Sequence, residues 1–213
     1  MSQSEISPTQ VREMLLLTAD RVIAAEPELS AADRALGDGD HGLGMQRGMK
    51  AVQAKLAELP DETSIEQLFT GAGMAMLSSM GGASGALFGT LFRAGGKAVG
   101  DRESLDGSGL ADFFQAALEG VQTRGKAKPG DKTMIDALAP AAGAATEQAG
   151  AGVAAVAAAA AKAAAEGRDA SKDMVATMGR AKTLGQGSVG HPDAGACSVA
   201  IICQAFADFI DQA

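Results

Sequence analysis

Apolar residues recur along the chain at spacings of three and four positions, which is the period of an amphipathic helix. Seven such stripes can be traced between residues 11 and 210. They comprise Val11, Leu15, Val22 and Ile23; Met45, Met49, Val52, Leu56 and Leu59; Leu68, Phe69, Met76 and Leu77; Leu87, Phe88, Leu91 and Phe92; Leu110, Phe113, Phe114, Ala117 and Val121; Met134, Ile135 and Leu138; and Val199, Ile202, Cys203, Phe206 and Ile210. The pattern predicts a largely helical protein.

Local signals indicate where some of these helices begin and end. Ser64 followed by Gln67 is a capping box, in which each residue's side chain binds the other's backbone N–H at a helix start. Gly125 follows the fifth stripe, at a position typical of the residue that ends a helix. We therefore expect the third helix to begin after Ser64 and the fifth to end before Gly125.

A run rich in Ala ends at Glu166, and Ala has the highest helix propensity of all residues. Together with residues 169–178 it predicts one further helix, interrupted at Gly167. The chain contains no Trp or Tyr and only seven Phe, which excludes a strand-rich sandwich. Its 213 residues suit one domain, spanning 1–213. We expect an all-α bundle of about eight helices.

The charge balance excludes a nucleic-acid partner. The chain has 18 Lys and Arg against 26 Asp and Glu, a formal charge of −8, whereas binding a phosphate backbone requires a basic surplus. A local phosphate site is still compatible with this balance.

The sequence also predicts a compartment. Its first ten residues lack the basic and apolar regions of a signal peptide, so we expect a cytoplasmic protein. The most apolar run, residues 151–165, consists of weakly hydrophobic Ala interrupted by Lys162, so we expect no membrane span. Cys197 and Cys203 are six positions apart in a helical pattern and lie on different faces, so we expect reduced thiols.

One connector places three carboxylates, Asp33, Asp38 and Asp40, within eight residues. Crowded carboxylates remain ionised together most easily when a divalent cation compensates them, and oxygen ligands suit Mg²⁺ or Ca²⁺. A calcium loop of the EF-hand type fails, because the twelfth position from Asp38 is Met49 instead of Glu. Mg²⁺ is then preferred. A solvated turn with a helix N-cap is the structural alternative.

Two nucleotide-binding motifs match only in part. Gly37-x-Gly39-x-x-Gly42 has the spacing of a dinucleotide-binding loop, but no strand pattern precedes it. Residues 125–133 are similar to a P-loop, but Asp131 separates the glycine from the lysine and a helix precedes them. Neither motif supports its usual fold.

Three other connectors favour an anion. Residues 80–85 combine glycines and Ser84 at a helix start, and residues 125–133 bring three lysines to another. A glycine hinge and a solvated basic turn are the alternatives. Residues 179–195 add cations and Asp193, which can also be only an N-cap. Because this last segment has few apolar side chains, we expect contacts with a bound ligand to order it as a lid.

Four segments together resemble the nucleotide-binding L subunit of dihydroxyacetone kinase. They are DRALGDGDHG at 33–42, SSMGGASG at 78–85, RGKAKPGDKTM at 124–134 and GHPDAGA at 190–196. They occur in the family's order over essentially the whole chain. The resemblance implies an antiparallel up-and-down barrel of eight helices, with the nucleotide site in the loops at one end.

The resemblance also implies the ligands. Asp33, Asp38 and Asp40 would hold two Mg²⁺ ions that bridge the phosphates of ADP or ATP. Nucleotide contacts would come from His41, Gly42, Leu43, Gly44, Ala83, Ser84, Gly125, Met134, Arg180, Asp193, Ala194 and Gly195. None of these residues is assigned a catalytic role, because in this family a His on a separate K subunit holds the ketose covalently.

The resemblance implies a phosphotransferase that is active only with its K subunit. It also implies that the protein forms a homodimer or a hetero-oligomer. Two donors stay open: ATP that exchanges, or a phosphotransferase-system protein that rephosphorylates bound ADP. Gly44 and Ala194 depart from the family, where bacterial relatives have Asn and Pro, and this puts nucleotide retention in question. A non-catalytic helical module that binds Mg-ADP and docks on a protein partner is the alternative function.

Overall fold

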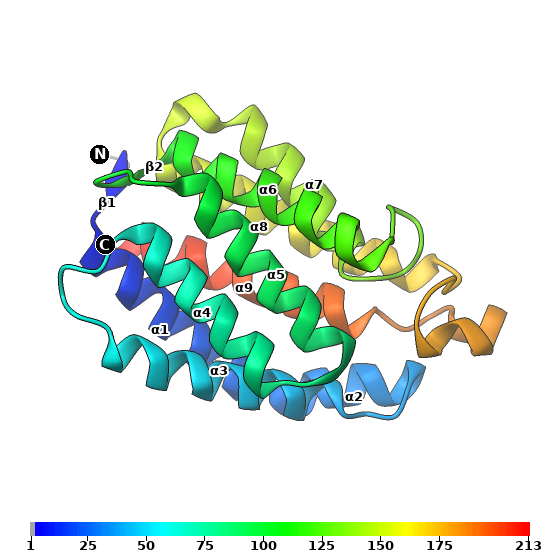
Figure 1. Cartoon of the computed structure of the whole chain (residues 1–213). Helices are drawn as coiled ribbons and strands as arrows, with labels where there is room; N and C mark the ends of the chain where they lie inside the picture. Colours follow the sequence, from blue (N-terminus) through cyan, green and yellow to red (C-terminus); the bar gives the residue numbers. More distant parts are fainter. Residues whose placement is uncertain (1–2) are drawn as a thin grey trace.

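Eight helices form a closed ring in the computed structural model, which describes residues 3–213 (Figure 1). They are α1 (Pro8–Ala24), α3 (His41–Glu58), α4 (Ile65–Ser79), α5 (Gly82–Val99), α6 (Gly107–Gly125), α7 (Ile135–Glu147), α8 (Val153–Ala170) and α9 (Ala194–Gln212). Each helix packs against the next in this order, and α9 packs against α1. The predicted all-α, up-and-down architecture is confirmed.

The remaining elements are short or lie outside the ring. Helix α2 (Glu26–Leu36) continues from α1 and packs on α3 and α9. Strands β1 (Glu5–Ile6) and β2 (Leu105–Asp106) pair antiparallel and join the chain's start to the α5–α6 connection. Three 3₁₀ turns are η1 (Ala149–Ala151), η2 (Ser171–Asp173) and η3 (Arg180–Ser188).

Aromatic side chains from helices far apart in sequence meet in the core. The ring of Phe113 on α6 lies 4.5 Å from that of Phe69 on α4 and 6.1 Å from that of Phe206 on α9, centroid to centroid. All three side chains are fully buried. Such pairs stabilise a fold beyond the area they bury, so this cluster ties opposite sides of the ring together.

The sequence predictions are wrong at four places outside the strong stripes, and the fourth of these is Gly167. Helix α2 was not predicted, because its buried residues, Leu29, Ser30 and Leu36, form a weak stripe. Residues 174–178 are not helical, since α8 ends at Ala170 and only the turn η2 follows it. Gly125 is not the left-handed residue after α6; Lys126 takes that conformation, with φ of 59°.

Gly167 does not interrupt α8 but lets it approach α7. A Cβ at this position would overlap the carbonyl oxygen of Asp136 and come within 2.8 Å of Pro140 Cγ. Pro140 lies inside α7 and has no N–H to offer that carbonyl. Gly167 is therefore needed for close packing between the two helices.

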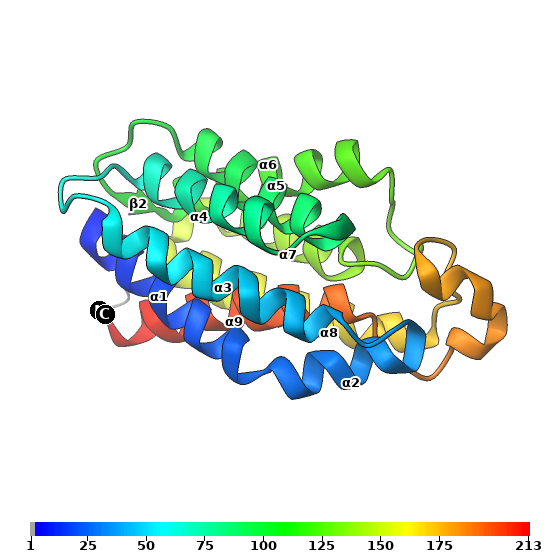
Figure 2. The same ribbon diagram turned by 60° about the horizontal axis from the view of Figure 1, so that its bottom comes forward.

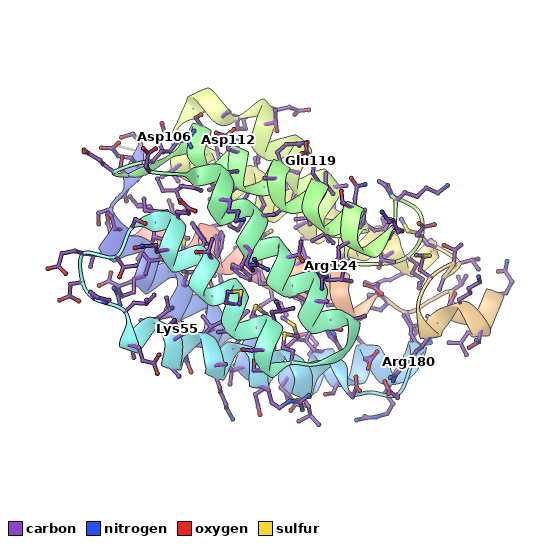
Figure 3. All side chains as sticks on the ribbon, in the orientation of Figure 1. Lys55, Asp106, Asp112, Glu119, Arg124 and Arg180 are labelled. Atoms are coloured by element: carbon purple, nitrogen blue, oxygen red, sulfur yellow. The ribbon has the colours of Figure 1, made fainter. Side chains whose placement is uncertain are left out.

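The up-and-down order brings every second connection to the same end of the ring. The connections α2–α3, α4–α5, α6–α7 and α8–α9 gather at the end opposite the two chain termini (Figure 2). These are the four segments in which the sequence concentrates Asp, Gly, Lys and His. Arg180 lies at this end, whereas Asp106 and Asp112 lie at the opposite one (Figure 3).

Within the described residues, α9 alone has the length and apolar composition that a membrane crossing would require. Most of this helix is buried inside the fold, where it contacts α1, α7 and α8. Its apolar character therefore follows from its place in the core.

Replacing Gly167 by Ala should lower the free energy of unfolding by about 1–3 kcal/mol, because the added methyl group forces α7 and α8 apart. Gly143→Ala is the matched control. Gly143 lies on the exposed side of α7 with open space around its Cβ position, so this change should be neutral or stabilise by about 0.5–1 kcal/mol. Urea unfolding of both variants measures the difference; equal effects would contradict the packing role of Gly167.

Candidate functional site

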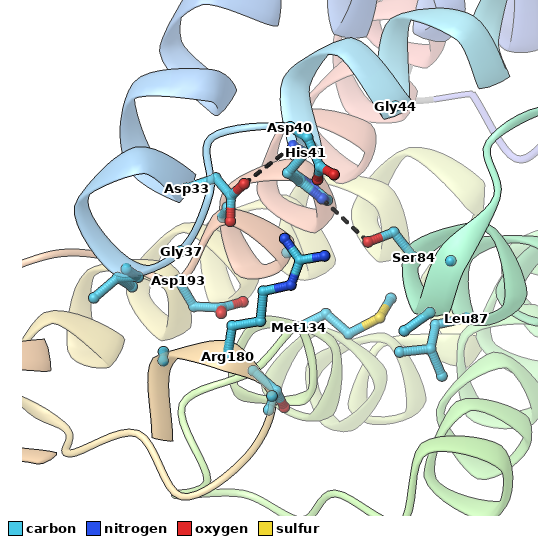
Figure 4. Close-up of a pocket in the computed structure, with 18 of the residues that line it drawn as sticks. Asp33, Gly37, Asp40, His41, Gly44, Ser84, Leu87, Met134, Arg180 and Asp193 are labelled. Carbon is cyan, nitrogen blue, oxygen red and sulfur yellow. Dashed lines mark hydrogen bonds between the residues drawn. The ribbon is translucent and has the colours of Figure 1, made fainter. Parts of the chain in front are cut away.

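A cavity of about 370 Å³ lies between the four gathered connections (Figure 4). It is lined by Asp33, Leu36, Gly37, Asp38, Asp40, His41, Gly44, Arg47, Met80, Gly81, Gly82, Ala83, Ser84, Leu87, Phe88, Lys132, Thr133, Met134, Met178, Gly179, Arg180, Ala181, Asp193, Ala194 and Gly195. Its volume is in the range of small-molecule sites. Every one of the four connections contributes to its wall.

One wall carries the three carboxylates. Single oxygens of Asp33, Asp38 and Asp40 all lie within 4.8 Å of one another. Asp33 Oδ2 accepts a hydrogen bond from the backbone N–H of His41 at 3.1 Å. Asp40 occupies the N-cap position of α3, but its side chain accepts no capping bond there. The N-cap alternative is therefore wrong for Asp40, and the cluster has the oxygen donors that a hard divalent cation needs.

Asp38 is compensated differently. Its carboxylate forms an ion pair with the guanidinium of Arg180, which reaches across the cavity from η3 (Figure 4). A positive side chain therefore faces a group of carboxylates that repel one another. Arg180 and a metal ion are alternative ways to balance the charge of Asp38.

The start of α5 forms the opposite wall. Gly81 and Gly82 have φ of 74° and 60°, which favours glycine, and no side chain caps the helix. A Cβ at either position would meet open space, and the first-turn residues Gly82, Ala83 and Ser84 all line the cavity. Uncapped N–H groups and the positive end of the helix dipole favour an anion here.

The imidazole of His41, the first residue of α3, lies next to serine side chains on two other helices, α5 and α9. Its Nε2 lies 2.8 Å from Ser198 Oγ on α9 and its Nδ1 lies 3.4 Å from Ser84 Oγ on α5. Ser198 Oγ also donates to Ala194 O, and the tautomer that suits this arrangement has its proton on Nε2. Burial lowers the pKa of His41 below 6.5 despite the nearby Asp33 and Asp40, so the imidazole is neutral at pH 7.

The 126–134 loop satisfies most of its own backbone donors. Asp136 accepts from the N–H groups of Gly130 and Thr133, at 2.5 and 2.7 Å. Asp131 Oδ2 accepts from Lys128 N at 2.8 Å, and a hydrogen bond from Thr177 lowers the pKa of Asp131. The N–H groups of Lys128, Gly130 and Thr133 are therefore not available to an anion, and the prediction that free N–H groups of this loop bind one is wrong for these three.

Most of the twelve candidate nucleotide-binding residues line the cavity, and the others do not. Nine line the cavity: His41, Gly44, Ala83, Ser84, Met134, Arg180, Asp193, Ala194 and Gly195. The other three do not line it. Gly42 packs against Ser30 of α2, the side chain of Leu43 is 49% exposed on the outer face of α3, and Gly125 packs against Leu87.

Several lining residues were not found by sequence reasoning. Leu87 and Phe88 belong to an apolar stripe, which indicates core packing and gives no sign of a cavity wall. Arg47 lies on α3 beyond its first turn, and its Nη2 donates to Met80 O at 3.3 Å. Thr133 could have been found from its position beside Met134.

The departures at Gly44 and Ala194 both fall on the cavity wall. A Cβ at Gly44 would lie 3.9 Å from Arg47 Nη2, with no closer neighbour, so a side chain at this position would extend into open space. Ala194 is the first residue of α9, directly after its N-cap residue Asp193. Neither departure blocks the cavity.

Comparisons with known proteins agree with this geometry. Residues 35–208 match the family model of the DAK2 domain. The chain is 41% identical over 186 residues to the ADP-binding subunit DhaL of PEP-dependent dihydroxyacetone kinase 1 from Listeria innocua, covering 87% of this chain and 88% of that protein. It is 40% identical over 204 residues to the ADP-binding subunit DhaL of the PEP-dependent kinase of Escherichia coli, covering 95% and 97%.

A solved structure is similar throughout the chain. The dihydroxyacetone kinase of C. freundii, in complex with AMP-PNP and Mg²⁺, superposes with a TM-score of 0.73 at 26% sequence identity. The match covers 98% of this chain but 35% of that chain, so the present chain spans about a third of the larger kinase.

The carboxyl of Asp193 should make stability depend on pH. Burial raises the pKa of Asp193 to about 7, although its Oδ2 accepts from Ala196 N at 2.8 Å and caps α9. The folded protein therefore holds a proton that the unfolded chain releases above its ordinary pKa of 3.8. Between these two values the contribution of this group to stability falls as pH rises.

Asp193→Asn keeps an oxygen that can cap α9 but cannot ionise. Its stability relative to the parent should therefore be greater at pH 7.5 than at pH 5, measured by urea unfolding without nucleotide. Asp61→Asn, in an exposed turn, should show no such difference. A pH-independent effect of Asp193→Asn would show that the carboxyl does not titrate in this range.

Proposed function

The chain belongs to the DAK2-domain family, and from this membership we propose that it is the nucleotide-binding subunit of a dihydroxyacetone-type kinase. It holds Mg-ADP or Mg-ATP, and the terminal phosphoryl group passes to a short-chain ketose on a separate K subunit. The proposal treats residues 1–213 as one nucleotide-binding domain acting in the cytoplasm, where its two buried cysteines remain free thiols.

The proposal rests on the opposite charge preferences of the two cavity walls. Across one cavity, three clustered carboxylates face the uncapped, glycine-rich start of α5. Cations suit the first wall and anions suit the second, so the cavity is complementary to a metal–polyphosphate and to neither component alone. Phosphoryl transfer depends mainly on such positioning and charge compensation.

The residues present fit Mg²⁺. Asp33, Asp38 and Asp40 offer only oxygen donors, and no capping bond occupies the side chain of Asp40. When bound, Mg²⁺ neutralises charge on the phosphates and on the group being transferred. We propose two such ions, held by these three carboxylates.

The chain's own residues would then position the nucleotide. The first-turn N–H groups at Ala83 and Ser84 bind phosphate oxygens, and Arg180 exchanges its partner Asp38 for a phosphate. Met134, Asp193, Ala194 and Gly195 enclose the rest of the molecule. His41 holds Ser84 in place through its imidazole.

The acceptor lies on the partner. Both histidines of the chain belong to the cavity connections, and His41 is buried among hydrogen bonds within the chain. The proposal therefore assigns the ketose to a K subunit. The donor is either exchanging ATP or a phosphotransferase-system protein that rephosphorylates ADP in place.

Asp40→Asn should weaken binding of Mg-ADP by at least about tenfold, because one carboxylate ligand is lost. The nucleotide-free protein should be as stable as the parent or more so, since the change relieves repulsion and breaks no capping bond. Calorimetric titration and thermal unfolding measure the two effects. Asp61→Asn, beyond the far end of α3, controls for loss of one negative charge; unchanged affinity of Asp40→Asn would rule out its metal role.

The isolated chain should not phosphorylate dihydroxyacetone, because it positions a donor and binds no acceptor. Adding a K subunit with ATP, or with the phosphoenolpyruvate relay, should give turnover in a coupled assay. Turnover by the isolated chain would refute the two-subunit account. Binding of Mg-ADP without turnover under either donor condition would favour the regulatory module instead.

A further inference from the structure

Lys132 is a buried lysine that the proposed chemistry does not use. The residue is 2% exposed. Its Nζ donates to two backbone carbonyl oxygens, at 2.5 Å to Ser171 and at 2.7 Å to His191. Although Lys132 lines the cavity, its ammonium is engaged by these two carbonyl oxygens within the protein.

The two acceptors are the two ends of one segment. Residues 171–191 leave the ring after α8, project beyond it as η2 and η3, and return before α9 (Figure 1). Two further bonds close the same base: Gly190 N donates to Lys172 O at 2.7 Å, and Asp193 N donates to Ser171 Oγ at 3.0 Å. Lys132 also holds these two ends together, and it does so from a different loop, the α6–α7 connection.

The segment has little core of its own to hold it in place. Between residues 172 and 190 only Ala176 and Ser188 are buried, joined by a 2.9 Å hydrogen bond from Ala176 N to Ser188 Oγ. Leu184 and Val189 are exposed. Fixing a backbone without burial is unfavourable, so external contacts must hold this segment near the cavity.

The backbone at Lys132 is adapted to this contact. Its φ is 60°, in the left-handed region that side chains other than glycine rarely adopt. Such a conformation persists where the surroundings require it. The neighbouring Asp131 also holds the segment, since its Oδ1 accepts from Thr177 Oγ1 at 2.7 Å.

Burial and nearby acidic groups act on the ammonium in opposite directions. Burial lowers the pKa of Lys132, and the carboxylates of Asp193, Asp173 and Asp136 oppose this effect. The two carbonyl oxygens of Ser171 and His191 therefore form a cation site that the protein fills with its own side chain.

We propose, on the basis of the nucleotide site proposed above, that Lys132 is a positioning residue that clamps the base of the 171–191 segment. The clamp holds Met178, Gly179 and Arg180 against the cavity before nucleotide binds. Nucleotide contacts then need to order only the middle of the segment, residues 181–187. Lys132 thus slows nucleotide release without touching the nucleotide.

The first experiment uses the nucleotide-free full chain and needs no ligand. Hydrogen exchange of residues 172–190 is compared in the parent, Lys132→Met and Lys162→Met, the last being an exposed lysine on α8. Exchange in the segment should rise by about tenfold in Lys132→Met only, while α1 and α4 keep parent rates. A general destabilisation would raise exchange in every helix and would overturn the proposal.

The second experiment measures release of a fluorescent ADP analogue in the presence of Mg²⁺. Release should be about tenfold faster from Lys132→Met, and Lys132→Arg, which keeps a cation with several donors, should move both readings back toward the parent. Lys132→Gln, which keeps one donor group, serves where the Met variant does not fold and should give intermediate values. Parent-like exchange and release in the folded variants would overturn the clamp.

The two proposals fail in different ways. If the parent does not bind the Mg²⁺–ADP analogue, the proposed function fails, and the exchange experiment still decides the role of Lys132. If the parent binds the analogue and Lys132→Met behaves as the parent in both measurements, the clamp alone is wrong.

Discussion

Mutual repulsion among three carboxylates governs the candidate site. Oxygens of Asp33, Asp38 and Asp40 lie within 4.8 Å of one another on the cavity wall. Like charges this close destabilise the folded chain unless a cation compensates them. The structure provides a partial solution in the guanidinium of Arg180, which pairs with Asp38. A divalent cation would provide a fuller one, and it would also let an anionic polyphosphate approach.

The ring topology makes this arrangement possible. Because α1 and α2 run in sequence before the chain turns back into α3, the acidic connection lies at the same end as the α4–α5, α6–α7 and α8–α9 connections. Each connection then takes a separate role. The first gathers carboxylates, the second offers free N–H groups, and the third holds the fourth in place through Lys132.

Sequence reasoning succeeded where a residue's role is local or strongly periodic. Seven stripes and the Ala-rich run together predicted the eight ring helices, and the Ser64–Gln67 capping box forms as expected, with Ser64 Oγ accepting from Gln67 N at 3.3 Å. It failed where a contact is made over long range. The close approach of Gly167 to Asp136 O and the clamp of Lys132 join residues dozens of positions apart, so no local pattern reveals them.

In the candidate site, too, local features could be predicted from the sequence and long-range contacts could not. Asp33, Asp38 and Asp40 are close in sequence, and their meeting could be predicted from spacing. The orientation of Gly42 and Leu43 could not, because packing between α2 and α3 decides which side of the first turn of α3 faces the cavity. A resemblance carries over residue types, whereas side-chain contacts such as the Arg180–Asp38 pair depend on the folded chain.

The most direct test of the central claim is where a bound divalent cation lies relative to both the carboxylates and the phosphates. Mn²⁺ can replace Mg²⁺, and its electron–nuclear double resonance spectrum reports phosphorus nuclei in its coordination sphere. We expect phosphorus coupling when the parent chain binds Mn²⁺ together with ADP, and loss of the bound signal in the variant with Asp33, Asp38 and Asp40 all changed to Asn. If ADP bound with full affinity in excess chelator, or if that variant bound Mn²⁺ equally well, the three carboxylates would not hold a metal that bridges to the phosphates.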